Sequence, residues 1–208
     1  AGQPAVHSID EFVFSVPDLE AARHFYASFG LEVRDIDGAL ALHTYGHPHR
    51  WARVLEAATH KRLQWLSLGI HAADLDAFSH RIDGAGIARI PAPAGAQTDG
   101  IWIASPDGVP IQLRAAAKSS PSAPAPHVLP PACRNAGRAP ARSLMPQIRP
   151  LHLSHVLLFC ADVDAALAFY TEVLGLRLSD RSGSVIAFLH SPHGSDHHLL
   201  ALAASHGP

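Results

Sequence analysis

One pattern recurs along the chain and constrains its fold more than any other feature. A short apolar segment is followed by an acidic residue, then by apolar side chains at helical spacing, and finally by a glycine or a turn. Residues 16–26 and 160–170 align position by position, with a Phe-Tyr pair at the end of each, and residues 72–77 fit the start of the same pattern. Because internal repeats indicate repeated structural units, the sequence predicts three copies of one unit.

The third copy defines the unit most clearly. Residues 153–160 are apolar and rich in large and β-branched side chains, which favours a buried strand. Asp162 is placed to cap a helix over 162–174, and Gly175 is placed to end it. Further strands are predicted at 176–181, 184–190 and 197–203. The unit is therefore βαβββ.

The first copy has a predicted strand at 9–16, a helix at 18–29 and strands at 31–36, 39–44 and 51–56. The second has a strand at 64–70, a helix at 74–84 and strands at 101–104 and 110–114. The helices at 18–29 and 162–174 are expected to pack on the sheets through apolar stripes that include Tyr26, Phe29 and Tyr170. The predicted fold class is α+β, built from tandem βαβββ modules, of which three are present.

A proline-rich segment separates the second copy from the third. Eight of the chain's 17 prolines lie in residues 116–150, and the segment has neither helical nor strand periodicity. We therefore expect an N-terminal domain of two modules at 1–115, a linker without regular structure at 116–150, and the first module of a second domain at 151–208.

Composition excludes some classes of function. A formal charge of −2 over 208 residues offers no basic surface for nucleic acid or for an acidic membrane. No apolar stretch reaches bilayer length and no signal peptide is visible, so a cytoplasmic protein is expected. The two cysteines, Cys133 and Cys160, form no disulfide framework and are expected to be free thiols.

The repeats resemble the vicinal oxygen chelate superfamily, in which tandem βαβββ modules carry a Ser-Pro-Asp-Gly-x-x-Ile-x-Leu strand like residues 105–113. The third copy resembles type I extradiol ring-cleaving dioxygenases in particular, through its His-Val-Leu-Leu-Phe strand, the Phe-Tyr-Thr-Glu-Val-Leu-Gly-Leu end of its helix, and its Asp-His-His-Leu-Leu-Ala-Leu strand. The resemblance implies an Fe(II) or Mn(II) enzyme that cleaves a catechol-type aromatic diol with O₂. Two histidines and one glutamate would leave open positions on the metal for both reactants.

The resemblance places individual residues in that site. His155 matches the metal-binding histidine of the third module, and strand alternation groups it with Leu153, Leu157 and Phe159. His198 matches a histidine beside the metal that shuttles protons, a role that suits imidazole because it titrates near neutrality. His197 is expected to be structural, since alternation sends it to the opposite face. His190 and His193 are expected to be solvated or rim residues.

The first two copies can be aligned with the same family pattern. Glu11, Ser67 and Gln112 then stand at the positions that hold the metal ligands. Serine is a poor ligand and glutamine is neutral, so this half is expected to be metal-free.

The sequence ends at His206-Gly207-Pro208, where the resemblance places a fourth module with the other histidine and glutamate ligands. We therefore expect an incomplete site with weak or no activity. The uncovered sheet face is expected to expose Leu157, Phe159, Leu200 and Leu202 and to favour a homo-oligomer. Two other functions stay open: a metal-free small-molecule binding protein, which a dry cleft would indicate, and a glyoxalase-like isomerase, which Gln112 disfavours.

Overall fold

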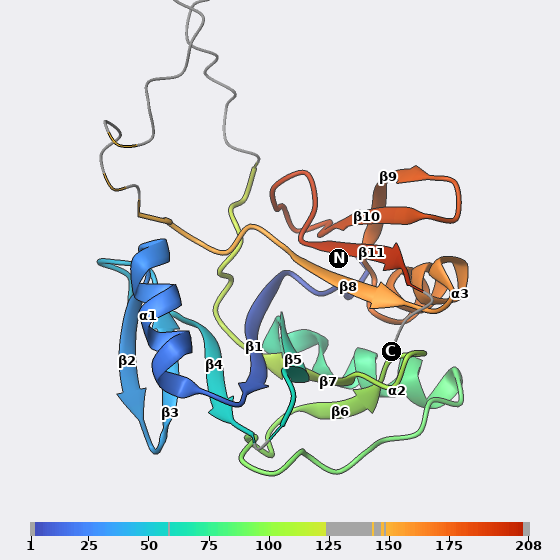
Figure 1. Ribbon diagram of the computed structural model, residues 1–208. Helices are drawn as coiled ribbons and strands as arrows, with labels where there is room; N and C mark the ends of the chain where they lie inside the picture. Colours follow the sequence, from blue (N-terminus) through green and yellow to red (C-terminus); the bar gives the residue numbers. More distant parts are fainter. Residues whose placement is uncertain (1–2, 58, 124–142, 144–146, 148, 206–208) are drawn as a thin grey trace, which may run out of the picture.

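A computed structural model describes residues 3–57, 59–123, 143, 147 and 149–205 (Figure 1). Most of the predicted linker, together with Cys133 and the last three residues, lies outside the described residues. Residues 116–123 are described and form neither helix nor strand. Cys160 is buried as a free thiol.

The first two copies share a seven-stranded sheet of order β2-β3-β4-β1-β5-β7-β6. At its centre, β1 (Ser8–Val16) pairs parallel with β4 (Arg50–Glu56) and antiparallel with β5 (Arg62–Ile70). The outer strands are β2 (Glu32–Ile36), β3 (Ala39–His43), β6 (Ile101–Ala104) and β7 (Pro110–Ala115). Pairing of β1 with β5 therefore joins the two copies into one sheet.

The third copy forms a four-stranded sheet of order β8-β11-β10-β9. Its strands are β8 (Val156–Cys160), β9 (Arg177–Ser182), β10 (Ile186–His190) and β11 (Leu200–Ala204). Strand β8 lies at the edge and runs parallel to β11, with Val156 opposite Leu200. The ends at which these two strands begin are therefore adjacent.

The helices are α1 (Leu19–Phe29), α2 (Leu75–Gly84) and α3 (Val163–Ala168). A 3-10 turn (Ala72–Asp74) precedes α2, and a π-helical turn (Phe169–Val173) follows α3. The predicted caps are confirmed: the Asp18 side chain accepts a hydrogen bond from the backbone of Ala21, and Asp162 accepts two at the start of α3. Gly30 and Gly175 end the helical segments with positive φ, a conformation that glycine adopts without strain.

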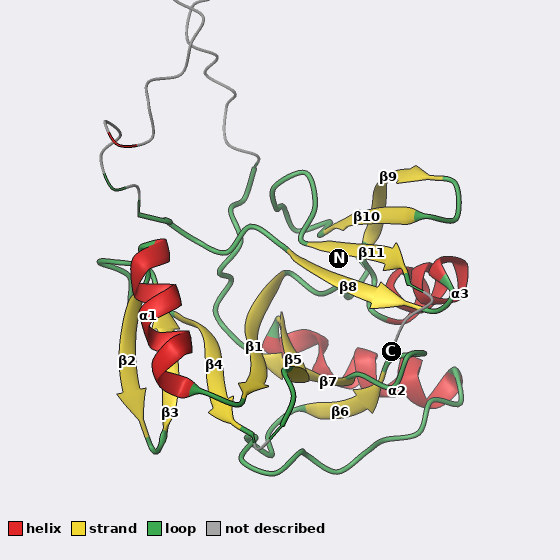
Figure 2. Cartoon of the chain, in the orientation of Figure 1, coloured by secondary structure: helices red, strands yellow, loops and turns green. Residues whose placement is uncertain are grey.

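The two sheets share one core. Helix α2 packs against the π-helical turn, and one hydrophobic cluster joins Phe78 and Ile82 of α2 to Tyr170 and Val173 of the third copy. Figure 2 shows α2 and α3 close together between the two sheets. Tyr170 is 2% exposed, as predicted. None of the helices in the described residues has the length and apolar character needed to span a bilayer.

Packing of α1 differs from the prediction at one end. Tyr26 is half-buried against the sheet, but Phe29 is 60% exposed, so its assignment to the packed stripe was wrong. Phe29 is the last residue of the helix, and it stacks on the equally exposed Phe25 instead of on the sheet.

The second copy has one strand fewer than the βαβββ pattern requires. Between α2 and β6, the described residues 85–100 form only an isolated bridge from Arg89 to Ile103. The division into domains at 1–115 and 151–208 stays a proposal.

The prediction for the exposed sheet face was half wrong. Leu157 and Phe159 are 44% and 67% exposed, but Leu200 and Leu202 are buried. The register pairs Leu200 with Val156 and Leu202 with Leu158, so both leucines share the face that packs in the core. Ala201 and Ala203 lie opposite Leu157 and Phe159, so the expected grouping was off by one residue in register, and such a difference exchanges the two faces of a strand.

Candidate metal centre

His155 immediately precedes β8 and its side chain is exposed. The strand was predicted to begin at residue 153. Its pairing begins instead at Val156, whose backbone N–H donates to the oxygen of Leu199, just before β11, over 3.2 Å. The two exposed apolar residues of β8, Leu157 and Phe159, follow at alternate positions. His155 therefore lies at the end of an open sheet face.

His198 approaches β11 from the preceding turn, and its ring centroid lies 4.2 Å from that of His155. The predicted pair is thus brought together, because the parallel pairing of β8 and β11 places the residues before each strand side by side. His198 Nε2 is buried and has no hydrogen-bond partner among the described residues. Burial, together with the charges of His155 and His197, lowers the pKa of His198.

His197 and His198 do not lie on a strand as predicted. Residues 197 and 198 precede β11 instead of forming its start, so strand alternation does not apply to them. The Nδ1 atoms of His197 and His198 are 3.1 Å apart, and the Phe188 ring lies 4.8 Å from the His198 ring. His197 is exposed.

The two histidines expected at the rim have protein partners. His190 Nδ1 lies 2.7 Å from the Ser179 hydroxyl. His193 packs against His71, with ring centroids 4.8 Å apart, and its buried Nε2 has no partner among the described residues. Both residues are partly exposed.

Two polar residues near His155 were not predicted. His152 Nε2 lies 3.0 Å from Asp196 Oδ2, which connects the segment entering β8 to the turn before β11. Burial alone would raise the pKa of Asp196, but hydrogen bonds from His152 and Ser154 hold that pKa below its ordinary value. The run Asp196-His197-His198 was visible in the sequence, but nothing there showed which residues the carboxylate would contact.

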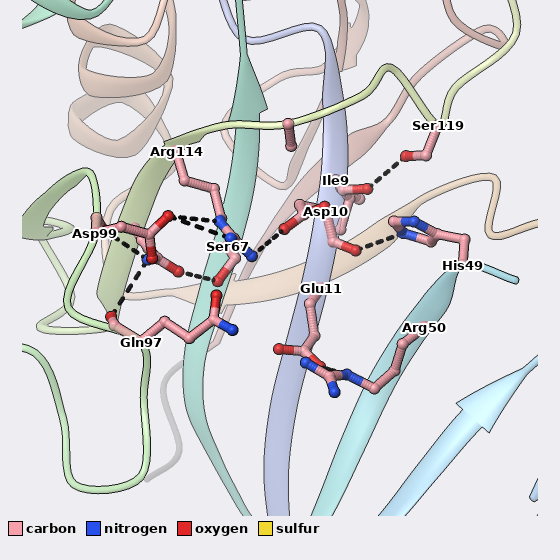
Figure 3. Close-up of polar contacts among 12 residues, drawn as sticks. Ile9, Asp10, Glu11, His49, Arg50, Ser67, Gln97, Asp99, Arg114 and Ser119 are labelled. Atoms are coloured by element: carbon pink, nitrogen blue, oxygen red, sulfur yellow. Dashed lines mark hydrogen bonds and ion pairs between the residues drawn. The ribbon is translucent and has the colours of Figure 1, made fainter. Parts of the chain in front are cut away.

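The corresponding positions of the first two copies lie in one row across the larger sheet. Glu11 is opposite Ser67 on β5, and Ser67 is opposite Gln112 on β7. The buried Glu11 carboxylate is paired with Arg50 and Arg53. Figure 3 shows Glu11 and Arg50 directed toward each other, in the neighbourhood of a second group formed by Arg114 and its acidic partners.

Hydrogen bonds also occupy the other two positions of this row. The Ser67 hydroxyl donates to Gln112 Oε1 over 2.7 Å, and the Gln112 amide donates to the backbone oxygen of Asp99 over 2.8 Å. Arg114 in turn pairs with Asp10 and Asp99. The side chains of this row are therefore engaged with protein partners. No group of three His, Cys, Asp or Glu side chains in the described part of the chain is arranged to hold a metal ion.

Comparison with known proteins agrees with this fold. The model of the Glyoxalase/Bleomycin resistance protein/Dioxygenase superfamily matches residues 152–208. Metapyrocatechase 2 of Cupriavidus necator is 42% identical over 202 residues, which are 97% of this chain and 62% of that protein. The chain therefore spans less than two thirds of this relative's length.

Two solved structures show the same fold at low sequence identity. The Mn(II)-bound glyoxalase from Novosphingobium aromaticivorans has a TM-score of 0.66 at 24% identity, over 97% of this chain and 63% of that one. The 2,3-dioxygenase LapB from Pseudomonas sp. KL28 has a TM-score of 0.68 at 20% identity, over 98% of this chain and 72% of that one.

Proposed function

We propose that this chain carries part of the active site of an extradiol dioxygenase that opens the ring of a catechol-type diol with O₂. The single observation that supports it most is the His155–His198 pair, with ring centroids 4.2 Å apart at the start of two parallel strands. The 42% identity to a metapyrocatechase supports the same reaction class.

The imidazole of His155 could contribute one ligand to a divalent transition metal. His155 offers an exposed imidazole, and His198 has a buried ring nitrogen without a partner among the described residues. Neutral imidazole is a common ligand of iron. In this proposal His155 binds Fe(II), or Mn(II) in its place, and the further histidine and glutamate ligands come from a fourth module. When bound, the metal would hold the diol and O₂ side by side and allow electrons to pass from the ring to O₂.

His198 is assigned to proton transfer. Its lowered pKa favours the neutral ring at neutral pH, and a neutral ring has a lone pair that can accept the proton of a substrate hydroxyl. Asp196 would stabilise the protonated ring that results, since its charge acts in the opposite direction to those of His155 and His197. The neighbouring Phe188 ring limits the positions the imidazole can take.

The test measures bound iron and the rate of catechol cleavage. We expect the 208-residue chain to bind iron weakly and to cleave no ring, because one ligand does not hold Fe(II) against water. Extended by a fourth module, it should bind iron stoichiometrically. In that form, His155→Ala should lose the iron, whereas His198→Ala should keep it and turn over roughly 10²-fold to 10⁴-fold more slowly.

His24→Ala serves as the control, since His24 is exposed on α1. Stoichiometric iron in the 208-residue chain, or full activity after His155→Ala, would overturn the proposal. A folded, extended chain that binds a small aromatic molecule but no iron would instead indicate a binding protein.

A further inference from the structure

Two phenylalanines of α1 occupy positions that are buried in the third copy. Phe25 is 60% exposed, whereas its counterpart in the repeat, Phe169, is 9% exposed. Phe29 and Leu174 each precede the glycine that ends their helical segment, yet Phe29 is as exposed as Phe25 and Leu174 is fully buried. The difference therefore lies in what packs against each segment.

In the third copy, a second helix covers these positions. One hydrophobic cluster joins Phe78 and Ile82 of α2 to Phe169 and Leu174, and α2 packs against the π-helical turn. Helix α1 packs mainly on β2, β3 and β4 of its own copy, and Figure 1 shows it apart from α2 and α3. The first copy therefore lacks a helix in the place that α2 takes on the third.

The surface beside α1 is an open apolar groove. Two adjoining cavities of about 360 and 310 Å³ share Phe14 and Tyr26. Apolar side chains from three elements line them: Phe25 of α1, Phe12 and Phe14 of β1, and Leu157 and Leu158 of β8. The charged lining residues are Asp18, which caps α1, and Lys61. An amphipathic helix is a common occupant of an apolar groove of this kind.

Strand β8, which lines one end of the groove, has one strand partner where its counterpart has two. In the repeat β8 corresponds to β1, and β1 pairs with β4 on one side and with β5 on the other. Among the described strands β8 pairs with β11 alone and ends its sheet. Because an edge strand offers unpaired backbone groups, a module that added a strand to β8 would bring its other elements next to the groove.

The last turn of α1 also lacks a contact that the third copy has. There, Arg81 of α2 donates to the backbone oxygen of Val173 in the π-helical turn over 3.1 Å. A cation near the last carbonyls of a helix is favourable, because those groups carry partial negative charge. Helix α1 has no basic residue in its last turn. A partner helix with a basic side chain at the position of Arg81 would supply this charge.

We propose that the groove beside α1 binds one amphipathic helix of a further βαβββ module, which packs on Phe25 and Phe29 as α2 packs on the third copy. This helix presents large apolar side chains at positions i and i+4, the spacing of Phe78 and Ile82, and a lysine or arginine at i+3, the position of Arg81. The inference shares the fourth module with the proposed function but rests on none of its chemistry.

Hydroxyl-radical footprinting with mass spectrometry tests the docking without any substitution. The oxidation rates of Phe25 and Phe29 are compared between the 208-residue chain and the chain extended by a fourth module. We expect Phe25 to be oxidised several-fold more slowly in the extended chain, in proportion to a fall from 60% exposure to the 9% of Phe169. His24 is the control on the same helix and should react equally in both chains, since His24 and its counterpart Ala168 are both exposed.

A substitution gives a second, independent measurement. Phe25→Ser should lower the urea midpoint of the extended chain more than that of the 208-residue chain, because only the extended chain has a helix to lose from the groove. Val185→Ser, a similar change at an exposed apolar residue, should affect the two chains equally. Equal oxidation of Phe25 and Phe29 in both folded chains would overturn the inference. So would protection that appears in the 208-residue chain as its concentration rises, since this would assign the groove to a second copy.

Iron binding separates this inference from the proposed function. Protection of Phe25 and Phe29 in an extended chain that binds no iron would leave the docking site standing and refute the dioxygenase. Stoichiometric iron in an extended chain whose two rings stay unprotected would do the reverse.

Discussion

Acidification should destabilise the fold through His7, whose side chain is buried where the third copy meets the first two. The ring is 0% exposed, lies 4.7 Å from His71, and has hydrogen-bond partners at both nitrogens. His71 in turn contacts His193 on the turn between β10 and β11. Burial, followed by the charges of His71 and His193, lowers the pKa of His7 from 6.5 to about 4.

The sign and size of the effect follow from this shift. Since the unfolded chain binds a proton at His7 more readily than the folded chain, the free energy of unfolding falls as the pH drops below 6.5 and levels off below about 4. At pH 5 the loss amounts to about 2 kcal/mol. Asp74 and Lys118, which face His193 with opposite charges, act on His193 in opposite directions.

Urea unfolding at a series of pH values measures this loss directly. The wild type should lose about 2 kcal/mol more between pH 7 and pH 5 than His7→Gln, which cannot titrate but can still form hydrogen bonds. The exposed histidine of α1 provides the control, and His24→Gln should follow the wild type. Identical pH dependence in His7→Gln and the wild type would refute the reasoning.

Three further variants test the packing described above. Asp162→Ala removes the N-cap of α3 and should cost about 1 kcal/mol in the free energy of unfolding measured with urea. Glu11→Gln leaves Arg50 and Arg53 without their buried carboxylate and should cost roughly 3 kcal/mol in the same assay; an unchanged midpoint would contradict the importance of this pair. Replacing the exposed Phe159 with serine should weaken self-association in sedimentation velocity, whereas the same change at the exposed Val185 on the loop before β10 should not.

Local sequence signals predicted the elements because they act within a few residues. Asp18 and Asp162 cap helices in the way their side chains allow, and Gly30 and Gly175 end helical segments with the backbone that glycine favours. The start of β8 depends instead on a partner some 40 residues away, since Val156 is the first residue to pair with the strand that begins at Leu200. Such nonlocal pairing leaves no mark in the sequence of either segment.

The sequence pointed to two residues of the candidate site and missed two others. His155 and His198 were proposed because the third copy resembles a family with histidines at these positions, and the structure brings their rings together. His152 and Asp196 were missed because polar residues in a turn or a linker look alike whether they face solvent or each other. The pairing of His152 with Asp196 became visible only when the two segments were placed side by side.

Corresponding positions in the two sheets differ in whether their polar side chains have protein partners. In the larger sheet, Glu11 is neutralised by arginines and Gln112 is bonded to Ser67, so the polar groups of the row are satisfied by protein partners. In the smaller sheet, His155 is exposed and His198 keeps a buried nitrogen without a partner among the described residues. An unsatisfied buried polar atom costs on the order of 1–3 kcal/mol and persists where something else is gained by it. That difference supports the proposal that the chemistry lies in the third copy.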